Sequence, residues 1–176
     1  DRRQSLEQAF ADDWDVVVAQ QQPDPLPVEW RTSVAAAIAD WDPLTQPRAV
    51  ITIADSGSYQ ETLDLHLGPG QQLIIQAADR RRPLLSLRDM ADAIAFLNLS
   101  GGNGEQAALT LDGLVIEGGI HIDARSLGQL SIRRCTLVPG LALSEQGRPQ
   151  QPAEASLWAD ADNTELSVAI DYSIRG

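Results

Sequence analysis

From residue 48 to the end of the chain, apolar and polar residues alternate in short runs separated by turn-forming residues. A period of two places successive side chains on opposite faces of a β-strand, and each run is too short for a helix. Gly, Asp, Asn or Pro lies between most runs, as turns require. We therefore predict that this part of the chain is all-β, with strands within residues 49–53, 62–67, 72–77, 84–87, 93–99, 108–118, 120–124, 129–138, 141–143, 156–161 and 165–174.

The strand pattern also repeats along the chain. Residues 109–119, LTLDGLVIEGG, align with residues 130–140, LSIRRCTLVPG, at a constant offset of 21, and residues 168–176 fit the same template. Upstream, Ile51 and Leu73 are 22 residues apart. Three short strands in a unit of this length are typical of one coil of a parallel β-helix, so we predict that fold.

Each repeat contains a bend between two strands. Two residues lie between the strands at this bend, and they change by one position which residues of the next strand point inward. The residue after the bend stacks on its equivalents in neighbouring coils. Strands in a sheet lie about 4.8 Å apart, so we expect small or compact residues at this position. Leu114, Cys135 and Ser173 would occupy the stack.

The N-terminal quarter of the chain has a different character. Residues 28–41 carry an apolar stripe at helical spacing from Trp30 to Trp41, with Pro27 before it and a Pro-containing stop after it. We expect the stripe to pack against the core, with an interface as the alternative. An open β-helix exposes strand edges at its ends, so we predict that residues 1–47, a helical cap and a Pro-rich linker, cover the first coil.

The β-helix coils are then predicted over residues 48–176, with one loop excursion. Residues 144–155, SEQGRPQQPAEA, are polar and rich in Pro and Gln, and would form either a binding surface or a plain solvated loop. The last strand has no evident cap. We expect it to pair with further coils of a longer parent protein or with another chain.

Composition and charge narrow the possible partners. The formal net charge is −12 and the sequence pI is about 4.4, which argues against nucleic acid and against an anionic membrane surface. A single cysteine excludes an internal disulfide, and no secretory signal pattern is present, so the compartment stays unknown. Because the chain starts without Met and ends on a strand pattern, we expect it to be a fragment.

Residues 50–85 and the I-x-x-C-x-L pattern at 132–137 resemble the pectin-lyase-like right-handed parallel β-helix superfamily, most of all its non-catalytic bacterial or phage-tail-like members. The first stretch contains strand, D-x-G-x-Y-x-E, strand, turn and strand, as in the opening coil of that superfamily. The resemblance implies a right-handed single-stranded coil in which Gly57 is the turn after the first strand, Tyr59 covers the open end and Glu61 begins the second strand. It is specific for the fold and weak for activity.

Catalytic signatures of the superfamily are missing from the sequence. The esterase motifs are absent. Hydrolysis of polygalacturonate would need neighbouring acids, and Asp112, Asp123 and Asp171 are the candidates, with solvated turn aspartates as the simpler interpretation. The DADN segment at 160–163 is interpreted as a turn, and His66 and His121 have no partner at metal-ligand spacing. We expect no metal and no cofactor.

The sequence therefore predicts a non-catalytic structural or binding module of a larger bacterial or phage-like protein. It would present its flank or its 144–155 loop to a glycan or a partner protein, with Arg148, Gln150 and Trp158 as candidate ligand-binding residues. The alternative is a fragment of a polysaccharide hydrolase or lyase that uses Asp112, Asp123 and Asp171. An acidic chain suits an anionic polysaccharide poorly unless calcium bridges the two.

Overall fold

The structure of the chain is a computed structural model that describes residues 14–23, 30–89, 95–100, 106–139 and 155–175. These residues are mostly β. The strands are β1 (Trp14–Val18), β2 (Trp30–Arg31), β3 (Arg48–Ile53), β4 (Ser58–Glu61), β5 (Asp64–His66), β6 (Gln72–Ala77), β7 (Leu84–Leu87), β8 (Phe96–Ser100), β9 (Ala108–Asp112), β10 (Val115–Glu117), β11 (Gly119–Ile122), β12 (Gln129–Arg133), β13 (Thr136–Val138), β14 (Leu157–Ala159), β15 (Ser167–Asp171) and β16 (Ile174–Arg175), and helix α2 spans Val34–Asp40.

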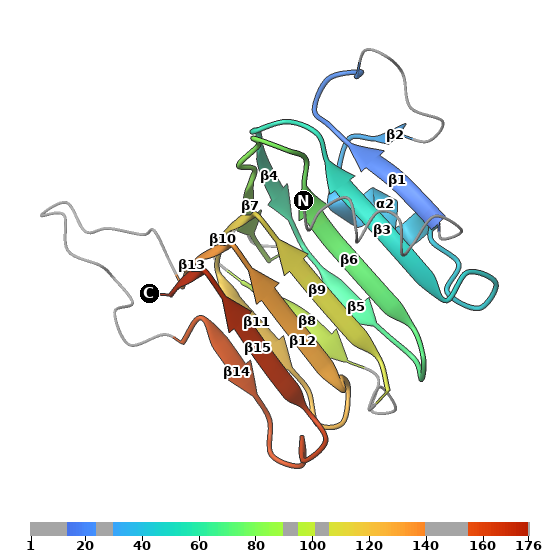
Figure 1. Cartoon of the computed structure of the whole chain (residues 1–176), viewed down its shortest axis with the longest axis vertical. Helices are drawn as coiled ribbons and strands as arrows, with labels where there is room; N and C mark the ends of the chain where they lie inside the picture. The colour runs from blue at the N-terminus through green and yellow to red at the C-terminus, as the bar shows by residue number, and fades with distance from the viewer. Residues whose placement is uncertain (1–13, 24–29, 90–94, 101–105, 140–154, 176) are drawn as a thin grey trace, which may run out of the picture.

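The strands form three parallel sheets. Sheet A has the order β15-β12-β9-β6-β3-β1-β2, sheet B the order β16-β13-β10-β7-β4, and sheet C the order β14-β11-β8-β5. From β3 onward the chain passes through sheets A, B and C in turn before it returns to A. Figure 1 shows the strands of sheet A side by side. The predicted all-β, parallel architecture is confirmed at this level. None of the helices in the described residues is long and apolar enough to cross a membrane.

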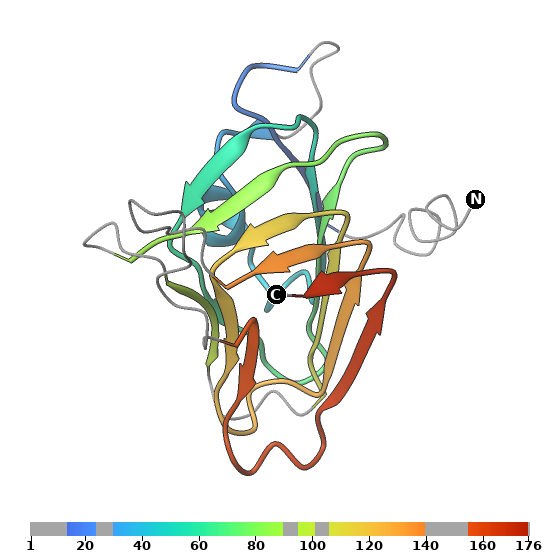
Figure 2. The ribbon, with the colours of Figure 1, turned by 90° about the vertical axis from the view of Figure 1, so that its left-hand side faces the viewer.

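Alternation along each strand divides its residues between a core and an outer face. In β3 every second residue is buried, including Ile51 and Ile53. Leu65 of β5 and Leu85 of β7 belong to the same hydrophobic cluster, so the three sheets share one core. Figure 2 shows their strands lying around a common interior. Folding removes these inward apolar side chains from contact with water. This burial makes the core the main source of stability.

The strand register confirms the 21-residue repeat and corrects its upstream copy. Leu109 pairs with Leu130 and Leu111 with Ile132, each at an offset of 21. Upstream, Leu73 pairs with Ala49 and Ile51 with Ile75, so the offset there is 24 and the predicted alignment of Ile51 with Leu73 is wrong. The predicted alignment differs from the observed pairing by two residues. Because side chains alternate with period two, this difference leaves the same residues pointing into the core.

The predicted stack at the bend is present between neighbouring strand connections of sheets A and B. Leu114 and Cys135 are buried. The Thr136 N–H donates to the Leu114 carbonyl at 2.9 Å, and the Cys135 N–H donates to the Ser173 hydroxyl oxygen at 3.1 Å. The residues at the bend position therefore lie next to one another, as the sequence predicted.

The N-terminal helix is shorter than its sequence pattern suggested. It begins after Ser33, whose hydroxyl oxygen accepts a hydrogen bond from the Ala36 N–H, and Trp30 lies in strand β2 instead. The serine cap requires an extended backbone, which excludes the residues before it from the helix. Trp41 at the helix end is buried in the core cluster, as core packing of the stripe required.

The D-x-G-x-Y-x-E segment is a structural junction. The Asp55 carboxylate accepts hydrogen bonds from the Gln20 and Gly57 N–H groups, both at 2.9 Å, and from the Tyr59 hydroxyl at 2.8 Å. Glu61 faces helix α2, and β4 begins at Ser58, three residues before the position expected from the resemblance. This segment therefore ties β1, β4 and α2 together.

Candidate functional site

The outer face of sheet C carries two columns of polar and aromatic side chains. Its inward residues, such as Leu97, Leu99 and Ile120, are fully buried in the core, so the intervening residues point outward. One outward column follows the strand register, and the second lies two residues further along each strand. We call these residues the sheet C face: Asp64, Asn98, His121 and Trp158 in the first column, and His66, Ser100, Asp123 and Asp160 in the second.

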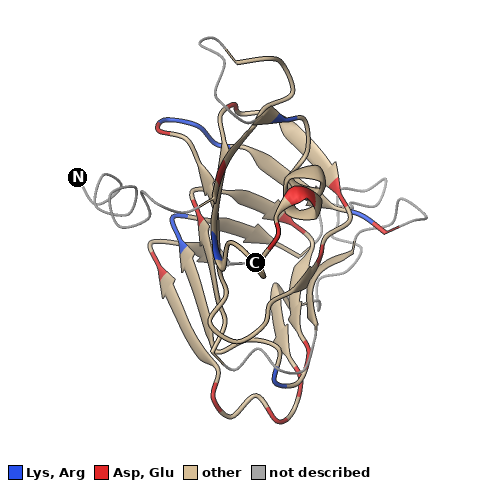
Figure 3. Ribbon diagram, turned by 90° about the vertical axis from the view of Figure 1, so that its right-hand side faces the viewer, with Lys and Arg blue, Asp and Glu red and all other residues tan. Residues whose placement is uncertain are grey.

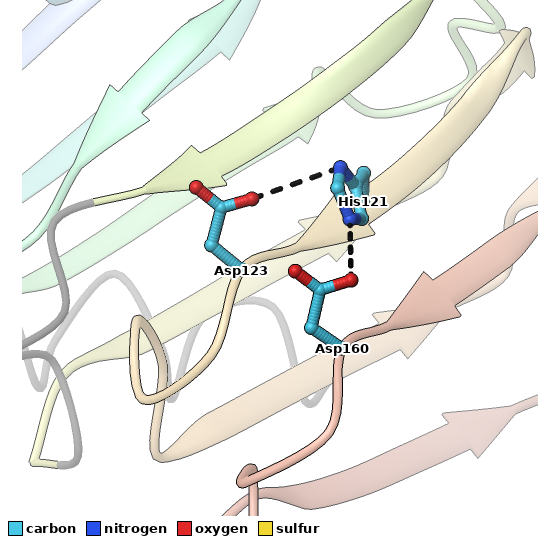
Figure 4. A group of neighbouring side chains, drawn as sticks. All are labelled: His121, Asp123 and Asp160. Carbon is cyan, nitrogen blue, oxygen red and sulfur yellow. Dashed lines mark hydrogen bonds and ion pairs between the residues drawn. The ribbon is translucent and has the colours of Figure 1, made fainter.

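His121 lies between two carboxylates on this face. Its Nε2 atom is 3.0 Å from Oδ1 of Asp160, and its Nδ1 atom is 3.7 Å from Oδ1 of Asp123. Figure 4 shows both carboxylates directed at the imidazole, Asp123 from the end of β11 and Asp160 from the end of β14. One ligand atom from each of the three side chains lies within 4.8 Å of the other two. The sequence prediction that His121 lacks a partner is therefore wrong.

Two aromatic rings hold the His121 imidazole from opposite strands. The ring centroids of Phe96 and Trp158 each lie 6.4 Å from that of His121, at interplanar angles of 69° and 85°. These are edge-to-face contacts. Gly119 makes the Phe96 position possible, because a Cβ atom on Gly119 would lie 2.4 Å from the Phe96 ring. Trp158 is 59% exposed, so its ring is available to a ligand.

The turn after β14 fixes the position of Asp160. The Asn163 side-chain amide donates to the carbonyls of Asp160 at 2.9 Å and Ile122 at 3.3 Å, and its oxygen accepts from the Arg125 N–H at 2.9 Å. The hydrogen bond with His121 lowers the pKa of Asp160, with a weaker opposing effect of desolvation. The Asp160 carboxylate is therefore held as an anion.

A polar hollow of about 350 Å³ adjoins this turn. Arg125, Asp162, Asn163, Thr164 and Glu165 supply its polar lining. Asn163 links the hollow to the end of the sheet C face, since the same amide holds Asp160.

The three aspartates predicted from sequence do not form one site. Asp112 and Asp171 lie in the same column of sheet A, with Arg133 between them on the intervening strand. They are two strand spacings apart, about 9–10 Å along the sheet. Asp123 lies on sheet C with His121. Asp112 and Asp171 therefore share a column of sheet A, and Asp123 lies apart from them on sheet C.

Asp112 is withdrawn from solvent. Only 2% of it is exposed, and its Oδ2 atom pairs with the guanidinium of Arg134. The Arg134 carbonyl in turn accepts a hydrogen bond from Arg82 at 2.9 Å. The Asp112 Oδ1 atom has no hydrogen-bond partner. A buried, ion-paired carboxylate of this kind is suited to holding the corner between sheets A and B and not to contact with a polymer.

A second buried acid has a similar structural role. Glu117 accepts hydrogen bonds from the Ser86 hydroxyl and from Arg88, the latter at 3.0 Å. Glu117 and Ser86 are both buried, and Arg88 neutralises the carboxylate. The negative charge of Glu117 is therefore balanced by the positive charge of Arg88 within sheet B.

The structure describes some of the other residues considered from the sequence and not others. Trp158 lies on the sheet C face beside His121. Arg148 and Gln150, with the rest of the 144–155 loop up to residue 154, lie outside the described residues. His66 contacts the Ser100 hydroxyl oxygen at 3.2 Å.

Sequence reasoning missed the His121, Asp123 and Asp160 group as a unit. A signal for half of it was present, because His121 and Asp123 are two residues apart on one strand and must share a face. Asp160 could not be added, because the strand that carries it follows a long excursion and its register with β11 was not predictable.

Charge on the described surface is dispersed. Figure 3 shows Asp and Glu at strand ends and in turns over the whole view, with arginines interspersed. No family model, curated protein or solved structure matches the chain. Functional inference therefore rests on the geometry of the sheet C face.

Proposed function

We propose that the chain is a non-catalytic binding module built on a right-handed parallel β-helix, and that the sheet C face is its ligand-binding surface. The single observation that carries the proposal is the exposed Trp158 ring beside His121 and two carboxylates. An aromatic ring next to convergent polar groups is the usual composition of a small-ligand or glycan site.

The β-helix assignment rests on the path of the chain. The strands visit the three sheets in a fixed sequence, and each pairs in parallel with the strand one circuit later. The 21-residue repeat and the buried bend stack support it, and right-handed crossovers are the rule for parallel strands. The pectin-lyase-like resemblance belongs to this proposal. Helix α2, which packs against β1, β2 and β4, would close the N-terminal end.

The proposed ligand is a neutral glycan. A sugar ring presents an apolar C–H face, which suits Trp158, and hydroxyl groups, which suit the Asp160, Asp123 and Asn98 side chains. The two columns of polar groups run across successive strands, so an extended oligosaccharide could lie along them. The chain charge of −12 would repel an anionic polysaccharide.

A polysaccharide hydrolase or lyase is the alternative function. One observation favours it: carboxylate oxygens of Asp123 and Asp160 lie within 4.8 Å of each other, near the roughly 5–5.5 Å separation of carboxyl groups in retaining glycosidases. Two observations oppose it. His121 lies between the carboxylates, and the pKa of Asp160 is lowered by the His121 hydrogen bond, whereas a general acid needs a raised pKa.

The C-terminal edge is proposed as a second contact surface, for strands of another chain or of further coils. Strands β14, β15 and β16 are the last in their sheets. Val168 is 42% exposed, whereas Leu109 and Leu130 in the same column are completely buried. An edge with apolar residues and unpaired main-chain groups is a template for strand addition.

Native gel electrophoresis in soluble polysaccharides tests the glycan proposal. Gels would contain hydroxyethyl cellulose, mixed-linkage β-glucan or glucomannan, with pectin as the anionic comparator and EDTA throughout. We expect at least one neutral polymer to retard the chain, Trp158→Ala to abolish the retardation, and Tyr172→Ala to preserve it. Tyr172 is the matched control because it is 90% exposed and lies between sheets A and B.

Two outcomes would oppose the proposal. Equal retardation of wild type and Trp158→Ala would place binding elsewhere, and no retardation in any neutral polymer would remove the glycan. Release of reducing ends from these polymers, lost in Asp160→Asn, would support the hydrolase instead.

A further inference from the structure

The group formed by His121, Asp123 and Asp160 has the donor set of a metal centre. We propose that these three side chains bind one divalent first-row transition-metal ion, with Zn²⁺ as the ion to test. The inference does not rest on glycan binding, because it concerns the ion alone.

The donors are one imidazole nitrogen and two carboxylate oxygens. Zn²⁺ accepts both kinds of ligand, at about 2.0–2.2 Å, whereas Ca²⁺ and Mg²⁺ prefer oxygen ligands alone. One ligand atom from each residue already lies within 4.8 Å of the others. The Asp123 and Asp160 side chains are 43% and 42% exposed, so they have room to rotate toward a single His121 nitrogen. Three protein ligands would leave a position open to water or to a ligand.

The strand register creates this convergence. His121 and Asp123 are two residues apart at the end of β11, so both point outward. Asp160 follows β14, which pairs with β11, and the Asp160 N–H donates to the Ile122 carbonyl at 2.9 Å. The third ligand is therefore held about one strand spacing, roughly 4.8 Å, from the strand that carries the first two.

The surroundings favour a cation. Two carboxylates at this separation repel each other, and a cation between them relieves the repulsion. The overall charge of −12 adds to the attraction. Phe96 and Trp158 restrict the His121 ring, so less freedom is lost when an ion binds. These rings and the imidazole distinguish the group from an ordinary cluster of surface acids.

His66 provides a matched control on the same sheet. It is the other histidine of the chain, and it lies in an outward column of sheet C as His121 does. Its described neighbour is the Ser100 hydroxyl. A site that needs two carboxylates beside the imidazole should therefore exist at His121 and not at His66.

Isothermal titration calorimetry with ZnCl₂ tests the inference, on chain without a polyhistidine tag. We expect one Zn²⁺ per chain in wild type and in His66→Ala. We expect His121→Ala and Asp160→Asn to weaken binding by about tenfold or more. Thermal unfolding gives a second readout: at one Zn²⁺ concentration the melting temperature should rise in wild type and His66→Ala, and should rise less in His121→Ala. Unfolding without metal establishes that each variant is folded.

The inference is overturned by any of three results. These are the absence of saturable one-to-one Zn²⁺ binding, an equal loss of affinity in His66→Ala and His121→Ala, and a Zn²⁺-dependent rise in melting temperature that is as large in folded His121→Ala as in wild type. Because no polysaccharide is present, a failure here leaves the outcome of the glycan experiment unaffected.

Discussion

The carboxylate of Glu61 accepts a hydrogen bond from the main-chain N–H of Val34 at 2.9 Å, across 27 residues of sequence. Its other oxygen accepts from the Ala35 N–H at 3.2 Å. A strand residue of sheet B thus satisfies two of the donors that every helix leaves unpaired at its start. The glutamate of the D-x-G-x-Y-x-E segment acts in this way as a distant helix cap.

Removal of this cap should destabilise the fold. Glu61→Ala would leave two N–H groups without acceptors in a buried setting, and we expect a loss of about 2–4 kcal/mol in the free energy of unfolding. Glu61→Gln keeps an oxygen acceptor and should lose less. Urea denaturation followed by circular dichroism measures both, and equal stability of wild type and Glu61→Ala would show that the cap contributes nothing.

Stability should depend on pH through Asp55. Burial alone would raise the pKa of this carboxyl, but hydrogen bonds from Gln20, Gly57 and Tyr59 outweigh it and the pKa is lowered. A pKa that is lower in the folded state stabilises the fold above the unfolded value of 3.8, and this contribution is lost as the pH falls through the folded value. We expect the urea midpoint of Asp55→Asn to fall less than that of wild type between pH 6 and pH 3. Parallel pH profiles would contradict this role.

The Cys135 thiol should be unreactive in the folded chain. It is 1% exposed, and burial raises its pKa, with nearby backbone hydrogen bonds opposing the shift. A thiol reagent such as DTNB attacks the thiolate, so we expect reaction only on unfolding. Val168→Cys places a second thiol at an exposed position and should react at once. Rapid modification of wild type in native buffer would show that the bend stack is open.

The C-terminal edge should promote association of the chain. Val168 is 42% exposed, whereas Leu130 and Leu109 in the same column of sheet A are buried, and Ile174 of β16 is 68% exposed. Light scattering coupled to size exclusion should show species larger than 19.0 kDa at high concentration, and Val168→Asp combined with Ile174→Asp should restore the monomer. A wild-type monomer at all concentrations would exclude pairing between copies of this edge.

Strand positions were predictable in the middle of the sheets, where alternate residues of a strand such as β3 are buried. Strands β6 and β7 match the predicted residues 72–77 and 84–87 throughout. Apolar and polar residues alternate along these strands because alternate side chains face the core, so the pattern is visible in the local sequence. The helix boundary was not predictable in the same way, because Ser33 and the distant Glu61 set it and the stripe from Trp30 onward continues through a strand.

The candidate site depends on register between distant segments. Leu130 pairs with Leu109 at an offset of 21 but with Val168 at an offset of 38, since the excursions between strands differ in length. Local alternation placed His121 and Asp123 on one face, but no local pattern reports which residue of β14 lies beside β11. Trp158 was selected from the sequence for its residue type, and its position beside His121 came from the structure.

The claim that the sheet C face is the ligand-binding surface is tested most directly by NMR titration with neutral hexasaccharides, cellohexaose and mannohexaose, in the presence of EDTA. We predict that the largest shifts occur at the Trp158 indole and at the backbone of Asn98 and His121. An unmoved Trp158 indole, with shifts confined to the 144–155 loop or to sheet A, would contradict the claim.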